Sequence, residues 1–103
     1  MNQPTFDKEG SPSEETLQRL ESWPLPFEGL LDFVEEVWND TYGKMTWDEE
    51  GRLELVTGGW SGNESIILAL QNNKNYFWTH YWYQSQRGGL HVLDKPITQE
   101  GKV

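Results

Sequence analysis

The chain has 103 residues, a length typical of one domain, and it contains no cysteine, which excludes disulfides, thiolate metal ligands and a cysteine nucleophile. Its net charge of −9 repels phosphate backbones and anionic lipid, so direct nucleic-acid binding is not expected and a partner with a basic surface is favoured. The first 50 residues contain thirteen acidic side chains against three basic ones, whereas residues 51–103 contain four against five. The excess of negative charge therefore lies in the first half.

The sequence starts without the basic and apolar segments of a signal peptide, and no apolar run approaches the roughly 20 residues that a membrane span needs. The absence of cysteine also fits a reducing compartment. We therefore expect a cytoplasmic protein that makes no membrane contact.

The composition of the two ends sets the expected domain boundaries. Residues 1–10 are polar and show no periodicity, so they are expected to form a disordered lead-in. A single domain is expected over residues 11–95, followed by a loose tail over residues 96–103.

The first helix is predicted to start in the run Ser-Pro-Ser-Glu at residues 11–14. Ser11 would be the N-cap, Pro12 suits the first helical position, and Glu14 completes a capping box. The helix should end at the Trp23-Pro24 pair, because proline lacks a backbone donor and biases its predecessor away from helical angles.

The second helix, predicted over residues 27–39, is the clearest element. Its apolar residues recur at helical spacing on one stripe, namely Phe27, Leu30, Leu31, Val34, Val37 and Trp38. Four carboxylates occupy the other face without a lysine or arginine four positions on, and these are Glu28, Asp32, Glu35 and Glu36. Such a face is either ordinary solvated surface or a docking face for a basic partner.

The hydrophobic period changes beyond Gly43. A hairpin is predicted with strands at residues 45–47 and 52–57 around a turn at 48–51. A helix follows, capped by Ser61 or Asn63 and ending near Gln71. A second hairpin is predicted with strands at 76–83 and 90–93 around a turn at 84–89. Two helices followed by β-β-α-β-β predict an α+β fold with a four-stranded, mainly antiparallel sheet and helices packed on it.

The glycine-rich loop of residues 57–64, TGGWSGNE, is the first candidate site. Loops of this kind can direct free backbone N–H groups at an anion. This one lacks the lysine of a P-loop and the spacing of a dinucleotide fingerprint, and Asn63 stands where a nucleophile elbow requires glycine. The loop is interpreted either as a tight turn that starts a helix or as a ligand-binding loop.

The aromatic segment 76–83 is the second candidate, in a chain with six tryptophans and 14% aromatic residues. As a strand it would present rings on both faces, so either helices cover both faces or one face meets a partner. A turn at residues 85–88 would pair Trp82 with His91 and His80 with Leu93, which places both histidines on one face. Neither histidine has a metal-ligand spacing, so structural roles are favoured and no metal or cofactor is predicted.

The strings GGWSGNE (58–64), Phe77-Trp78, Trp82 and Arg87-Gly88-Gly89 resemble a family of small bacterial and phage-borne proteins over roughly residues 45–93. In the family pattern a histidine directly follows the paired glycines, whereas here Leu90 precedes His91. The resemblance implies that the loop and the hairpin form one connected surface, and it implies no particular reaction. The candidate ligand- or partner-binding residues on that surface are Trp60, Ser61, Asn63, Glu64, Trp82, Arg87 and His91.

Three functional hypotheses follow from these features. The leading one is a non-enzymatic binding module, a regulator or inhibitor that contacts another protein, because the chain combines an acidic half and surplus aromatic residues with no recognisable catalytic constellation. The second is a small enzyme or small-molecule-binding protein that uses the 58–64 loop with Arg87 and His91. The third is a structural subunit of a larger assembly, which leaves a homo-oligomer open.

Overall fold

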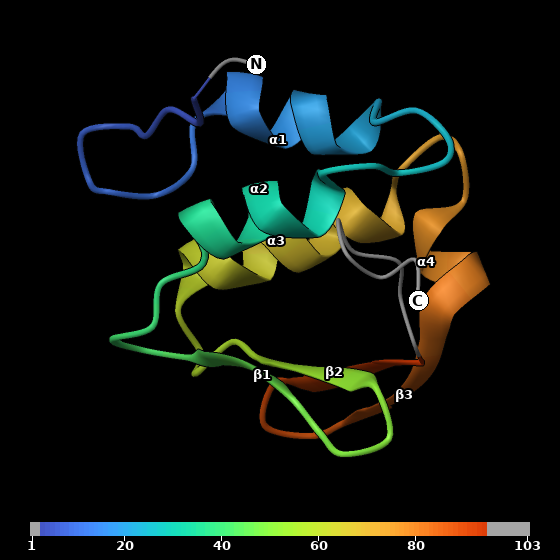
Figure 1. Ribbon diagram of the computed structural model, residues 1–103. Coiled ribbons are helices and arrows are strands. Elements are labelled where there is room, and N and C mark those ends of the chain that lie inside the picture. The colour runs from blue at the N-terminus through green and yellow to red at the C-terminus, as the bar shows by residue number, and fades with distance from the viewer. Residues whose placement is uncertain (1–2, 95–103) are drawn as a thin grey trace.

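The structure is a computed structural model, and it describes residues 3–94 (Figure 1). The elements in chain order are α1 (Glu14–Glu21), α2 (Leu30–Val37), β1 (Lys44–Trp47), β2 (Arg52–Val56), α3 (Ser61–Gln71), α4 (Phe77–Tyr81), β3 (Trp82–Gln86) and β4 (Leu90–Asp94). The predicted α+β class is confirmed. The tail expected over residues 96–103 lies outside the described residues.

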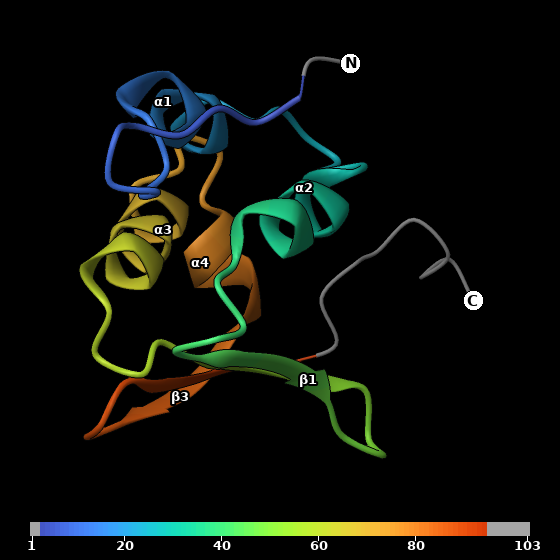
Figure 2. The same cartoon turned by 90° about the vertical axis from the view of Figure 1, so that its left-hand side faces the viewer.

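The four strands form one antiparallel sheet in the order β1-β2-β4-β3. Figure 2 shows α2, α3 and α4 on one side of this sheet, with α1 beyond them, and α1 packs against α3. The sheet is therefore covered by helices on one face, and β1 and β3 are its two edge strands.

The core lies between the sheet and the helices. All six apolar residues predicted for the stripe of the second helix are buried together with Phe33, namely Phe27, Leu30, Leu31, Val34, Val37 and Trp38. The helix itself is shorter than the predicted range of 27–39, because Phe27 has a positive φ of 72° and Trp38 is the C-cap of α2. Leu53 and Leu55 of β2 and Leu93 of β4 complete the core from the sheet side. The four carboxylates predicted for the opposite helix face are all exposed, and three of them, Asp32, Glu35 and Glu36, lie on α2.

The prediction of a strand over residues 76–83 is wrong for most of that range, because residues 77–81 form α4 and only Trp82 and Tyr83 belong to a strand. A helix places Phe77 and Tyr81 on one side, where their ring centroids lie 5.2 Å apart. Both rings pack on Phe27, with centroids 5.1 and 6.2 Å from it. Rings on both faces of a strand would leave one set in solvent, whereas the helical turn gathers these two against the core.

The last hairpin turns at residues 87–89, so β3 extends to Gln86. A register shift between Trp82 and Gln84 pairs Trp82 with Leu93 and Ser85 with His91. The predicted pairing of Trp82 with His91 is therefore wrong. The predicted pairing of His80 with Leu93 is also wrong, since His80 lies on α4.

Residues 3–10, which belong to the predicted lead-in, form hydrogen bonds with the start of α1. The Thr5 backbone N–H donates to Thr16 Oγ1 at 2.8 Å, and that hydroxyl donates to the Thr5 carbonyl at 2.9 Å. The N-cap of α1 is Ser13 instead of Ser11, and its Oγ accepts from the Thr16 backbone N–H at 3.1 Å. The fold thus uses Thr16 to tie the chain before α1 to the first helical turn.

The predicted cap of α3 also differs from the structure. Its N-cap is Trp60, and neither Ser61 nor Asn63 caps the helix, because both lie within its first turn. The side chain of Asn63 instead forms hydrogen bonds with the backbone of Asn39 and Thr57.

Candidate functional site

The loop and the last hairpin meet at a group of five side chains that we name the loop–hairpin cluster. Its members come from α3, α4, β3 and β4, and they are Glu64, Trp78, Trp82, Ser85 and His91. The backbone N–H of Thr57 joins the two segments by donating to the Gly89 carbonyl at 3.0 Å. The loop and the hairpin are thus in direct contact.

A chain of hydrogen bonds runs through the centre of the loop–hairpin cluster. Trp82 Nε1 donates to Ser85 Oγ at 2.9 Å, and Ser85 Oγ lies 2.8 Å from His91 Nδ1. The rings of Trp78 and His91 make a T-shaped contact, with centroids 5.7 Å apart and an interplanar angle of 72°. Two neighbours therefore restrict the orientation of the His91 ring.

Two opposing effects act on the charge of His91. Partial burial of the imidazole lowers the pKa of His91 below its usual value of 6.5, and the negative charge of Glu64 opposes that shift. Glu64 is itself oriented by Thr57, whose Oγ1 donates to Glu64 Oε2 at 3.4 Å. His91 is therefore mainly neutral at pH 7, and a proton that it gained would be stabilised by Glu64.

The structure brings together three of the seven residues predicted for the loop and hairpin, namely Glu64, Trp82 and His91. Trp60 instead stacks on Tyr42, with ring centroids 5.8 Å apart. Ser61 and Arg87 are exposed, and Arg87 forms no ion pair with any other residue in the 3–94 range.

Asn63, also predicted to bind a ligand, is completely buried. Its Oδ1 accepts from the Asn39 backbone N–H at 2.9 Å, and its Nδ2 donates to the carbonyls of Asn39 and Thr57 at 3.2 and 3.3 Å. Both donors and the oxygen of this amide are used to hold the start of α3 to the segments around it. Asn63 is therefore a structural residue of the loop and offers no group to a ligand.

Sequence reasoning missed Ser85 and Trp78 as members of the loop–hairpin cluster. Ser85 was assigned to a turn, and the bulge that brings it opposite His91 has no glycine or proline to mark it. Trp78 was assigned to a strand, whereas α4 directs it to the histidine. The paired glycines at 88 and 89, both with positive φ, were the available signal that the turn begins later.

A second feature is an acidic face formed by four exposed carboxylates, of which Asp32, Glu35 and Glu36 lie on α2 and Glu28 directly precedes the N-cap Gly29. We name these four residues the acidic face of α2. Within residues 3–94 none of these carboxylates takes part in an ion pair; Arg52 pairs with Glu50 and Asp94 instead. Among the residues that the structure describes, no basic side chain therefore forms an ion pair with the acidic face.

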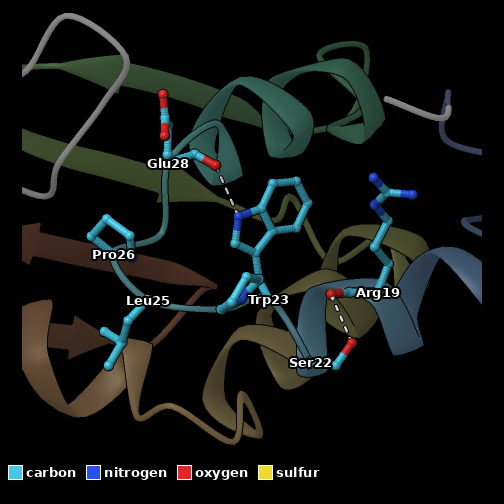
Figure 3. Close-up of a pocket in the computed structure, with 7 residues that line it drawn as sticks. Arg19, Ser22, Trp23, Leu25, Pro26 and Glu28 are labelled. Atoms are coloured by element: carbon cyan, nitrogen blue, oxygen red, sulfur yellow. Dashed lines mark hydrogen bonds between the residues drawn. The ribbon is translucent and has the colours of Figure 1, made fainter.

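A pocket of about 370 Å³ lies at the N-terminal end of the acidic face, in the connection between α1 and α2 (Figure 3). It is lined by Arg19, Ser22, Trp23, Pro24, Leu25, Pro26 and Glu28. The indole N–H of Trp23 donates to the Glu28 carbonyl at 3.0 Å, and the Arg19 guanidinium lies 5.5 Å from the Trp23 ring centroid. We name this the α1–α2 pocket. Sequence reasoning missed it because proline and tryptophan in a connection do not reveal how the connection curves.

Three further observations concern metal sites, membrane spans and similarity to known proteins. In the part of the chain from 3 to 94, no three or more histidine, aspartate and glutamate side chains gather closely enough to hold a metal ion. No helix in the same part is long and apolar enough to cross a membrane. Comparison of the chain with protein-family models, with curated proteins and with solved structures gives no match.

Proposed function

We propose that this protein is a protein-binding module that docks a basic segment of its partner on the acidic face of α2. The observation that supports this proposal is that Glu28 belongs both to the acidic face and to the α1–α2 pocket. A row of carboxylates therefore begins beside a partly apolar recess, which is the combination that a basic segment with one apolar anchor would fit.

Charge favours this class of partner over others. The face has four carboxylates, and the whole chain has a net charge of −9, so anionic partners are repelled and cationic ones are attracted over several ångströms. Lysine and arginine side chains spaced along a helix or an extended segment could meet the row in register. Contacts of this kind raise the association rate and specificity more than the affinity.

The α1–α2 pocket would supply the affinity. Leu25 is 59% exposed, and the ring of Trp23 forms part of the lining. Covering such apolar surface contributes about 25 cal/mol per Å², and a buried aromatic or leucine anchor is the usual centre of a small interface. We therefore expect the partner to place one large apolar side chain there, next to its basic residues.

The test uses two variants with the same net charge. In the first, Glu28, Glu35 and Glu36 become glutamine and Asp32 becomes asparagine; in the control, Glu9→Gln, Glu14→Gln, Asp40→Asn and Glu49→Gln remove four exposed charges elsewhere. Binding is measured by fluorescence titration with a lysine-rich synthetic helix that contains one tryptophan, and with the same peptide after tryptophan-to-alanine replacement.

The acidic-face variant should bind the tryptophan peptide at least tenfold more weakly than the wild type, and the control should change less than threefold. The alanine peptide should bind the wild type about tenfold more weakly than the tryptophan peptide. Equal losses in the two variants would show that binding follows net charge alone, and this would overturn the proposed docking face.

A further inference from the structure

The donor and acceptor groups of the loop–hairpin cluster determine the direction of its chain of hydrogen bonds. An indole N–H can only donate, so Ser85 Oγ is the acceptor of the 2.9 Å bond from Trp82. The serine's own hydrogen remains available for His91 Nδ1, 2.8 Å away. With the imidazole protonated at Nε2, the chain reads Trp82 to Ser85 to His91, with each group donating to the next.

This arrangement contains the parts of an activated nucleophile. A serine hydroxyl becomes nucleophilic when an adjacent base removes its proton, and the base must lie within hydrogen-bond distance and be unprotonated at the working pH. His91 satisfies both conditions. The indole N–H of Trp82 occupies an acceptor position of the serine oxygen and so helps to orient the hydroxyl toward His91.

We infer that Ser85 is a nucleophilic serine with His91 as its general base, and that the loop–hairpin cluster forms and cleaves acyl-serine bonds on small ester substrates. This inference does not rest on the proposed protein-binding function, because it uses none of the residues of the acidic face or of the α1–α2 pocket.

The remaining members of the cluster have positioning and electrostatic roles. Trp78 packs against the imidazole in a T-shaped contact and restricts the rotation of the ring. Glu64 has a charge that favours the imidazolium, so it stabilises His91 once the proton has been transferred. Neither residue needs to touch the substrate.

The reaction balances with water as the only co-substrate. Ser85 Oγ bonds to the carbonyl carbon of the ester while its proton passes to His91 Nδ1, and the carbonyl electron pair moves onto oxygen. Collapse of this intermediate breaks the bond to the leaving alcohol, which takes the proton from His91 and leaves an acylated serine. Water then attacks the acyl carbon and gives a proton to His91. That proton returns to Ser85 as the carboxylic acid departs.

Exposure of the site indicates the substrate class. Ser85 is exposed, and Trp82 beside it is 49% exposed, so an ester reaches the hydroxyl from solvent without entering a deep cavity. The open part of the indole offers an apolar surface for an aryl group. Small aryl esters fit this exposed surface.

The first test is covalent labelling with a fluorophosphonate, from which the serine oxygen displaces fluoride. Mass spectrometry of peptides from the labelled wild-type protein should locate the adduct on Ser85, and this readout needs no variant. Label on several serines at similar rates, or no label at millimolar probe, would overturn the inference.

The second test measures hydrolysis of 4-nitrophenyl acetate. Ser85→Ala should remove the protein-dependent rate, and His91→Gln should lower it by about 100-fold, the usual contribution of a general base. Ser65→Ala removes a partly exposed serine of α3 outside the cluster, and its rate should equal that of the wild type. Circular dichroism checks that each variant is folded, and equal rates in Ser85→Ala and wild type would refute the assignment.

The pH profile separates a general base from a merely structural histidine. The labelling rate should rise with pH and level off, with its midpoint below pH 6.5, because burial lowers the pKa of His91. Glu64→Gln removes the charge that raises this pKa, so the midpoint should move to lower pH. A rate that follows hydroxide concentration without a plateau would exclude His91 as the base.

Discussion

Alanine at Gly58 should lower the free energy of unfolding by at least about 3 kcal/mol more than alanine at Gly59. A Cβ atom at Gly58 would overlap the carbonyl oxygen of Tyr42, which is backbone and cannot rotate away. The loop would have to separate from the connection between α2 and β1 to accept it. Chemical denaturation followed by tryptophan fluorescence measures the change as a shift in midpoint at constant slope.

Gly59 is the matched control for backbone conformation. Both glycines have positive φ, +67° at Gly58 and +78° at Gly59, but a Cβ atom at Gly59 would meet no atom within 4 Å. Alanine at Gly59 should therefore cost only the left-handed conformation, about 1–2 kcal/mol. Similar losses at the two positions would show that the close approach of Gly58 to Tyr42 does not limit stability.

Asn63→Asp should destabilise the protein by at least about 3 kcal/mol at pH 7. The change removes the two amide hydrogens that bond to the carbonyls of Asn39 and Thr57 and places a buried carboxylate against those oxygens. Both effects disfavour the ionised form, so the pKa of the new carboxyl in the folded protein rises above its unfolded value of about 3.9.

The pH dependence of this variant has a definite sign. A carboxyl with a raised folded pKa binds its proton more tightly in the folded state, so stability relative to the wild type is highest below about pH 4 and falls as pH rises through the folded pKa. Below that range the protonated acid can donate one of the two lost bonds. Urea denaturation of variant and wild type from pH 3.5 to 7 measures the difference between their free energies of unfolding. Taking this difference removes the contributions of the other carboxylates, because both proteins contain them.

Asn39→Asp is the control for adding one negative charge nearby. The side chain of Asn39 acts only through Oδ1, which accepts from the backbone N–H groups of Thr41 and Tyr42 at 2.8 and 3.3 Å. A carboxylate keeps both bonds, so the change should stay within about 0.5 kcal/mol at every pH. A pH-independent loss in Asn63→Asp would contradict the hydrogen-bond directions described for this amide.

Local patterns in the sequence were enough to predict the second helix and the first hairpin. The apolar stripe from Phe27 to Trp38 repeats every three to four residues, and every member of it is buried. The turn Asp48-Glu49-Glu50-Gly51 separates two short strands that pair as expected. Both elements depend on neighbours within a few residues, which is the range over which periodicity and turn chemistry act.

The candidate site was predictable only in part. Glu64 and His91 were both selected from the sequence, but Ser85, which bonds to His91, was placed in a turn. A bulge in β3 changes which residue faces His91, and a shift of one residue exchanges the two faces of a strand. Asn63 was selected as a ligand residue because it lies in a glycine-rich loop, and its burial follows from contacts with Asn39, 24 positions earlier.

The amino-acid order alone determined the α+β class, the acidic face of α2 and the helix stripe beneath it, because composition and short-range periodicity report which side of an element avoids water. Packing in three dimensions decided that residues 77–81 coil against Phe27, that Ser85 meets His91, and that the α1–α2 connection forms a pocket. These outcomes depend on strand register and on contacts between distant residues, and no short window of sequence contains both partners of such a contact.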